Sequence, residues 1–140
     1  MSMPERLQRI VDLFAGAPRD LRLQALFDYS KRVPPVPEHI DQSHMERVHE
    51  CQTPFALWAE LDEEGRVRIA FAVPEEAPTV RGYAGILHEG LDGETPKAIM
   101  DVPPDFYLLL GLSDVVSPLR LRGMGAIITR LRSQVATLGV

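Results

Sequence analysis

The sequence contains very little cysteine: Cys51 is the single one. One cysteine cannot form a disulfide within the chain, which excludes the small secreted scaffolds that disulfides hold together. It also cannot build a metal site from several thiolates. Two interpretations of Cys51 remain, a small buried hydrophobic residue or a reactive thiol. The choice between them largely decides the function.

Long hydrophobic runs are absent as well. No apolar stretch approaches the roughly 18 residues of a membrane span, and the N-terminal sequence has no hydrophobic signal segment. We therefore expect a cytoplasmic protein that does not associate with membranes. At 140 residues, the chain has the size of one domain with one core, and we expect that domain to cover residues 1–140.

Positive charge is scarce through most of the chain. Residues 33–116 contain 16 acidic and 5 basic side chains, and the net charge of the protein is −5. An acidic surface repels phosphate backbones, so we do not expect nucleic-acid binding.

Residues 117–140 reverse this balance, with four arginines and no acid. Arg130 and Arg132 fall late in a predicted helix, where positive charge suits the helix dipole, and we expect both to be mostly solvated. Arg120 falls in the first turn of the same helix, where its charge opposes the dipole. That unfavourable position favours a functional role, although a surface arginine that packs its stem locally is the alternative.

Apolar periodicity predicts five helices and a β-hairpin. Residues 55–61 and 66–73 alternate with period two around an acidic, glycine-containing turn, and residues around 47–49 are expected to add a third strand. The predicted helices run from a Ser2–Glu5 capping box to Gly16, over 19–32, over 80–91, from the Thr95-Pro96 cap, and from the Ser117-Pro118 cap to about Ala136. These elements predict the α+β class, with a small antiparallel sheet of about three strands and helices packed on one face.

Two glycines interrupt the predicted helix over 80–91. Gly82 and Gly85 each cost up to ~1 kcal/mol of helix stability relative to alanine. Their presence predicts a close approach of this helix to the sheet or to another helix.

Cys51 lies in a polar, turn-prone stretch, and loops carry function more often than buried segments do. His49 is two residues away, and on an extended strand the two side chains would share a face. His49 could then act as the cation or base beside the thiol, or it could be an ordinary surface histidine. His44, His49, His88 and Cys51 could form a zinc site only by long-range assembly, because their spacing matches no zinc motif, so we expect no metal.

Five short blocks follow one another along the chain. They are Arg47-Val48-His49-Glu50-Cys51-Gln52-Thr53, Val80-Arg81-Gly82, Gly93-Glu94-Thr95-Pro96, residues 106–112 and residues 117–123. In order and spacing they resemble the sequence blocks of the SufE family, sulfur acceptors that work with cysteine desulfurases. Two departures stand out: Glu50 replaces the glycine that usually precedes the cysteine, and Glu76 is the acid that survives from a polar stretch before the helix that begins near Val80.

The resemblance implies a SufE/IscU-like fold and a role for Cys51 as the residue that forms a persulfide. The implied partners are a pyridoxal-phosphate-dependent cysteine desulfurase, which holds the cofactor, and an iron–sulfur scaffold complex. A cluster scaffold needs three cysteines, so this chain could carry sulfur but not assemble a cluster. We expect no cofactor of its own and no independent turnover, and either a monomer or a homodimer.

Two other classes remain open on the residues alone. One is a noncatalytic interaction module with an inert buried cysteine, and the other is a small thiol-dependent transferase. Under the leading hypothesis Cys51 is sheltered in the free protein and becomes accessible when the desulfurase binds, because an exposed persulfide would lose its sulfur to other thiols.

Overall fold

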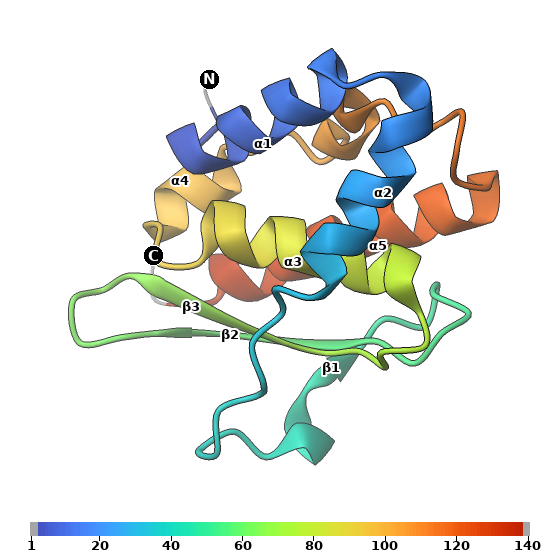
Figure 1. Cartoon of the computed structure of the whole chain (residues 1–140). Coiled ribbons are helices and arrows are strands. Elements are labelled where there is room, and N and C mark those ends of the chain that lie inside the picture. The colour runs from blue at the N-terminus through green and yellow to red at the C-terminus, as the bar shows by residue number, and fades with distance from the viewer. Residues whose placement is uncertain (1–2, 139–140) are drawn as a thin grey trace.

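The computed structural model describes residues 3–138, which form an α+β fold with helices stacked over a three-stranded sheet (Figure 1). The helices are α1 (Glu5–Gly16), α2 (Arg19–Ser30), α3 (Pro78–Leu91), α4 (Pro96–Met100) and α5 (Pro118–Ala136); the strands are β1 (Glu46–Arg47), β2 (Ala56–Leu61) and β3 (Val67–Ala72); the short 3-10 helices are η1 (Gln42–His44) and η2 (Phe106–Leu110). The predicted class and order of elements are confirmed.

Capping residues set the starts of the late helices as predicted. The Thr95 hydroxyl accepts a hydrogen bond from the Ala98 N–H at 3.2 Å, and the Ser117 hydroxyl accepts one from the Arg120 N–H at 3.3 Å. Each bond satisfies a backbone donor that has no partner within its helix. The Ser2 cap predicted for α1 lies outside the described residues.

The sheet is antiparallel in the order β1-β2-β3. β2 and β3 form the predicted hairpin, with a register that runs from Ala56 opposite Ala72 to Leu61 opposite Val67. β1 is confirmed as the third strand but contributes only two residues, which pair with the start of β2. The loop between β1 and β2 contains Cys51.

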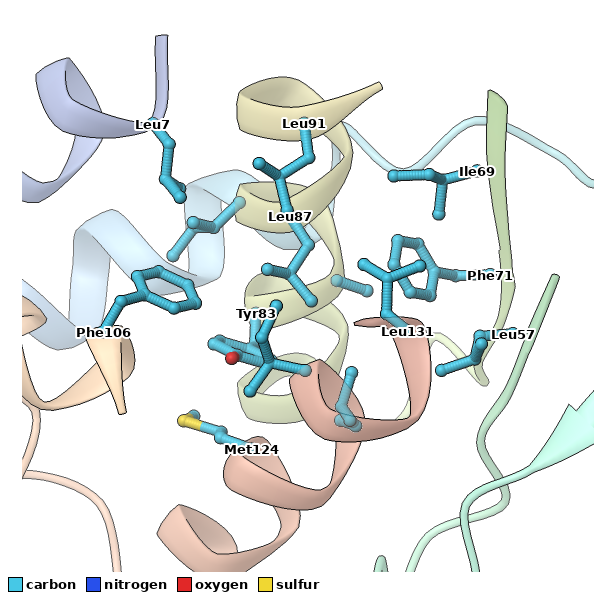
Figure 2. Packing of buried hydrophobic residues seen from close by; sticks show 14 of the residues in the cluster. Leu7, Leu57, Ile69, Phe71, Tyr83, Leu87, Leu91, Phe106, Met124 and Leu131 are labelled. Carbon is cyan, nitrogen blue, oxygen red and sulfur yellow. The ribbon is translucent and has the colours of Figure 1, made fainter. Parts of the chain in front are cut away.

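Helices α3 and α5 pack on one face of the sheet and enclose the main core (Figure 2). Inward side chains of the strands, such as Leu57 and Phe71, meet Leu87 and Leu131 from the two helices. Period-two alternation in the strands and helical spacing in α3 and α5 both direct these residues inward, as the sequence predicts. The core therefore fixes where α5 lies relative to the β1–β2 loop.

The glycines of α3 allow α2 to approach very closely. A Cβ atom on Gly82 would collide with the carbonyl oxygen of Leu26, and one on Gly85 would collide with that of Tyr29. The predicted close approach is confirmed, and its partner is α2 rather than the sheet. Backbone contact of this kind leaves no room to adjust.

The opposite face of the sheet is partly covered by the proline-rich connector after α2. Ile40 and Met45 from this segment bury themselves against Ala70 of β3 and form a second, smaller apolar cluster. In Figure 1 the connector passes beneath the sheet before it returns as β1. Across residues 3–138, none of the helices has the combination of length and apolar character needed to cross a membrane.

Candidate functional site

Cys51 lies at the tip of the loop that joins β1 to β2. The loop is closed at its base by a hydrogen bond from the Val48 N–H to the Phe55 carbonyl at 2.9 Å. A second bond, from the Cys51 N–H to the Val48 carbonyl at 3.1 Å, turns the chain sharply. This segment, residues 48–54, is called the Cys51 turn below. The polar, proline-containing sequence predicts such a turn.

The Cys51 side chain points toward α5. Its Sγ lies 3.9 Å from the carbonyl oxygen of Gly123, a weak S–H···O contact. A Cβ atom at position 123 would lie only 3.2 Å from that sulfur, so the missing side chain of Gly123 makes the space that the thiol occupies. The thiol is therefore partly buried and seated against a helix surface.

The surroundings of the thiol oppose its ionisation. Burial, and secondarily the negative charge of Glu50, raise the pKa of Cys51 from 9.0 to about 11, while Arg130 acts weakly in the other direction. The nucleophilic form of cysteine is the thiolate. In its seat Cys51 is accordingly a neutral thiol at physiological pH.

Arg130 of α5 holds the Cys51 turn through two carboxylates. Its Nη2 and Nε donate to Glu50 Oε1 at 2.9 and 3.1 Å, and its Nη1 donates to Glu46 Oε2 at 2.8 Å. Gln134, one turn further along α5, donates to Glu46 Oε1 at 3.0 Å and accepts from the Ala59 N–H at 2.8 Å. We call Arg130, Glu46 and Glu50 the Arg130 clasp.

The prediction that Arg130 and Arg132 are mostly solvated is wrong for both. The Arg130 side chain is only 27% exposed because it lies between the two carboxylates. Arg132 turns the other way, donates to the Met100 carbonyl at 2.8 Å and has a buried Nε. Hydrogen bonds to residues outside α5, rather than the helix dipole, determine where the two arginine side chains lie.

His49 lies on the Cys51 turn and is exposed. The expectation of a strand that places His49 and Cys51 on one face is wrong, because β1 ends at Arg47 and the chain turns at His49. The cation that affects the pKa of the thiol is Arg130. The pKa of Glu50 is lowered first by a backbone hydrogen bond and then by Arg130, with His49 as the smallest contribution.

Glu76 and Arg120 lie together in a pocket of about 340 Å³ beside the Cys51 turn. Thr53 of the turn lines the same pocket, together with Phe27 of α2 and the N-terminal residues of α3. Both charged side chains are exposed. The structure thus brings two residues singled out in the sequence to the neighbourhood of Cys51, where they border one hollow.

Sequence reasoning gave neither Gly123 nor Arg130 a role beside Cys51. Gly123 and Arg130 are seven residues apart, a spacing that places both on one face of α5, and this signal could have linked them.

Tyr83 carries a fully buried hydroxyl that has no hydrogen-bond partner among residues 3–138. Burial raises its pKa well above the usual value, with smaller contributions from Tyr107 and Cys51.

The arrangement supplies one potential nucleophile, the partly buried thiol of Cys51. A thiolate formed at Cys51 could attack an electrophilic sulfur or carbon atom, provided that the thiol first leaves its seat. Within the described residues, no three side chains of His, Cys, Asp or Glu come together as a possible metal site.

Comparison with known proteins gives consistent matches over nearly the whole chain. Residues 8–135 match the model of the SufE family, described as an Fe-S metabolism associated domain. An uncharacterized SufE-like protein of Mycobacterium tuberculosis is 43% identical over 131 residues, which cover 94% of this chain and 92% of that protein. The cysteine desulfuration protein SufE of Plasmodium vivax is 26% identical over 91% of this chain and 52% of its own. The solution structure of a hypothetical protein from Thermus thermophilus superposes with a TM-score of 0.86 at 47% identity, covering 96% of both chains.

Proposed function

Because the chain belongs to the SufE family, we propose that it accepts sulfur from a cysteine desulfurase on Cys51 and passes it to an iron–sulfur scaffold complex. The family match supports a role in Fe-S metabolism, and the names of relatives point to cysteine desulfuration. The observation that carries the finer proposal is the position of Cys51. The chain's one thiol lies at the tip of a surface loop, where it is partly buried against the core and makes a weak contact with α5.

The sulfur-transfer step exchanges one S–S bond for another. The Cys51 thiolate attacks the outer sulfur of a persulfide on the desulfurase, a new S–S bond forms, and the desulfurase cysteine leaves as a thiolate. No oxidant or reductant is consumed, because the transferred sulfur keeps its oxidation state. Pyridoxal phosphate acts only in the desulfurase, where it releases the sulfur from cysteine.

The raised pKa of Cys51 supports a resting state that waits for its partner. A thiol that titrates at about 11 is a poor nucleophile while it stays against Gly123. Binding of the desulfurase would favour a conformation in which the Cys51 turn swings outward and the thiol ionises in water. His49, exposed on the same turn, is a candidate to receive the proton.

Cys51 itself is tested by incubation with the desulfurase and cysteine. The intact mass of the wild-type protein should increase by one sulfur atom, and a reductant should remove it. Cys51→Ser should show no gain and no stimulation of sulfide production, because a hydroxyl cannot hold a sulfane sulfur. Its circular dichroism should match that of the wild type. Full stimulation by the serine variant would refute the proposal.

Arg120 and Glu76 are proposed to contact the partner or the outward form of the Cys51 turn. Both border the hollow beside Thr53, and Arg120 presents an exposed guanidinium there. Arg120→Ala should lower sulfur transfer or partner affinity about tenfold, the effect of losing one charge-assisted hydrogen bond. Arg122→Ala is the matched control, since Arg122 is exposed on the same helix. Equal behaviour of the two variants would remove Arg120 from the site.

The half-buried, neutral thiol also suits the alternative of a noncatalytic module with an inert cysteine. The two candidates differ in what the partner does to Cys51. Labelling by iodoacetamide should accelerate when a catalytically inactive desulfurase is added. Equal rates with and without the desulfurase would favour the inert module.

A further inference from the structure

One face of α5 meets the Cys51 turn at two points. Gly123 receives the thiol, and Arg130, two helical turns later, receives the carboxylate of the neighbouring residue Glu50. The contact between Sγ and the Gly123 carbonyl is long, at 3.9 Å, and too weak to fix the turn. The two bonds from Arg130 to Glu50, at 2.9 and 3.1 Å, are charge-assisted.

The two arms of the Arg130 clasp are unequal. Glu46 belongs to β1, and Gln134 holds its second oxygen, so this arm is tied to the sheet. Glu50 belongs to the turn and has a side chain that is 50% exposed, compared with 35% for Glu46. Arg130 is therefore anchored on the Glu46 side and open to water on the Glu50 side.

We propose that the Glu50–Arg130 ion pair is a latch that positions the Cys51 turn against α5 in the free protein. Release of Glu50 leaves the thiol held by its weak contact with Gly123 and by apolar packing against the core, so the turn opens more readily. The latch is argued from contacts between Arg130 and the Cys51 turn of this chain, and only its meaning for sulfur transfer rests on the proposed function.

The Arg130→Gln substitution distinguishes the latch from a purely electrostatic effect on the reactivity of Cys51. The positive charge of Arg130 lowers the pKa of Cys51, whereas Glu50 raises it. If charge were the only effect, Arg130→Gln would slow the reaction of the thiol and Glu50→Gln would accelerate it. With a latch, both substitutions open the turn, so both accelerate the reaction.

The experiment uses the full-length protein without any partner. Iodoacetamide labelling of Cys51 at pH 8 and amide hydrogen exchange of residues 48–54 are measured for the wild type, Glu50→Gln, Arg130→Gln and Glu89→Gln. Glu89→Gln is the control because it removes a carboxylate of similar exposure, which pairs with Arg32 on other elements of the fold. Amide exchange reports opening of the turn and does not depend on ionisation of the thiol.

We expect Glu50→Gln to increase both rates about threefold, as suits a half-exposed ion pair. Arg130→Gln should accelerate amide exchange at least as much and should also accelerate labelling, despite its effect on the thiol pKa. Glu89→Gln should leave both rates unchanged.

Two results would overturn the latch. One is a Glu50→Gln variant that behaves like Glu89→Gln, and the other is an Arg130→Gln variant with slower labelling and unchanged exchange. Sulfur uptake from the desulfurase is scored separately by intact mass. If the latch variants behave like the control but sulfur uptake is normal, only the latch is refuted. If the latch variants behave as expected but no sulfur is taken up, only the proposed function is refuted.

Discussion

Two helices of this protein use a missing side chain to admit a neighbour, and they do so with opposite consequences. On α3, Gly82 and Gly85 let the backbone of α2 come so close that any Cβ atom would strike a carbonyl oxygen. On α5, Gly123 admits only the sulfur of Cys51, at the end of a side chain on a surface turn. The first contact joins two helices permanently, because neither backbone can retreat. The second can be undone by moving one turn.

The comparison shows that the neighbour, rather than the glycine, decides whether a close contact is fixed or reversible. The α2–α3 contact lies beside the main core, where dense packing transmits any displacement. The Cys51 contact lies at the edge of the fold and is reinforced by ion pairs that are partly open to water. A function that needs motion is better served by the second arrangement.

Substitution of Gly85 should break the fixed contact and have the largest effect. Gly85→Ala places a methyl group against the Tyr29 backbone, and we expect a loss of about 3 kcal/mol in the free energy of unfolding, measured by urea denaturation. Gly16→Ala is the control, because nothing lies within 4 Å of a Cβ there. A Gly85→Ala protein as stable as the control would show that the α2–α3 contact can adjust.

Ionisation of Cys51 should produce an intermediate effect that reports the reversible contact. The folded-state pKa of about 11 lies above the ordinary value of 9.0, so the contribution of the buried thiol to stability is fully present below pH 9. It is lost as the pH rises from 9 toward 11. The wild type should lose on the order of 1 kcal/mol over this range relative to Cys51→Ser, after allowance for partial solvent exposure. If the free energy of unfolding depends on pH in the same way for both proteins, the contact with Gly123 does not disfavour the thiolate.

Substitution of Gly123 should have the smallest effect on stability. Gly123→Ala pushes a methyl group against Sγ, but the turn can move away and alanine favours the helix. We expect a change below about 1 kcal/mol, with faster labelling of Cys51 by iodoacetamide and a thiol pKa closer to its ordinary value. Gly125→Ala is the control, since its methyl group would meet the ring of Tyr107 instead. A large loss of stability in Gly123→Ala but not in Gly125→Ala would show that the Cys51 contact is as rigid as the contact between α2 and α3.

Local signals in the sequence account for most of the fold. Period-two alternation located the β2–β3 hairpin, and the Ser117-Pro118 cap located the start of α5. The glycines of α3 predicted a close neighbour, but nothing in the local sequence identified it as α2. The length of β1 was overestimated because the turn at His49 depends on hydrogen bonds to residues further along the loop.

The candidate site was predicted less completely, because its key contacts join distant parts of the chain. Cys51 was identifiable as a candidate from its rarity and its polar surroundings. Glu76 and Arg120 line one pocket with Thr53 of the Cys51 turn, and their role stays a prediction. The position of Arg130 was not predictable from its own helix. Its partners Glu46 and Glu50 lie 84 and 80 residues away, and only the packing of α5 on the sheet brings them together.

The seat of Cys51 also bears on how the protein withstands oxidants. Peroxides attack thiolates, and a thiol with a pKa of about 11 is ionised in roughly one molecule in 10,000 at neutral pH. Cysteine oxidised beyond the sulfenic acid is rarely restored, and this chain has no second cysteine to form a protective disulfide. In the proposed resting state, the space left by the absent side chain of Gly123 therefore keeps Cys51 in the protonated form, which peroxides attack slowly.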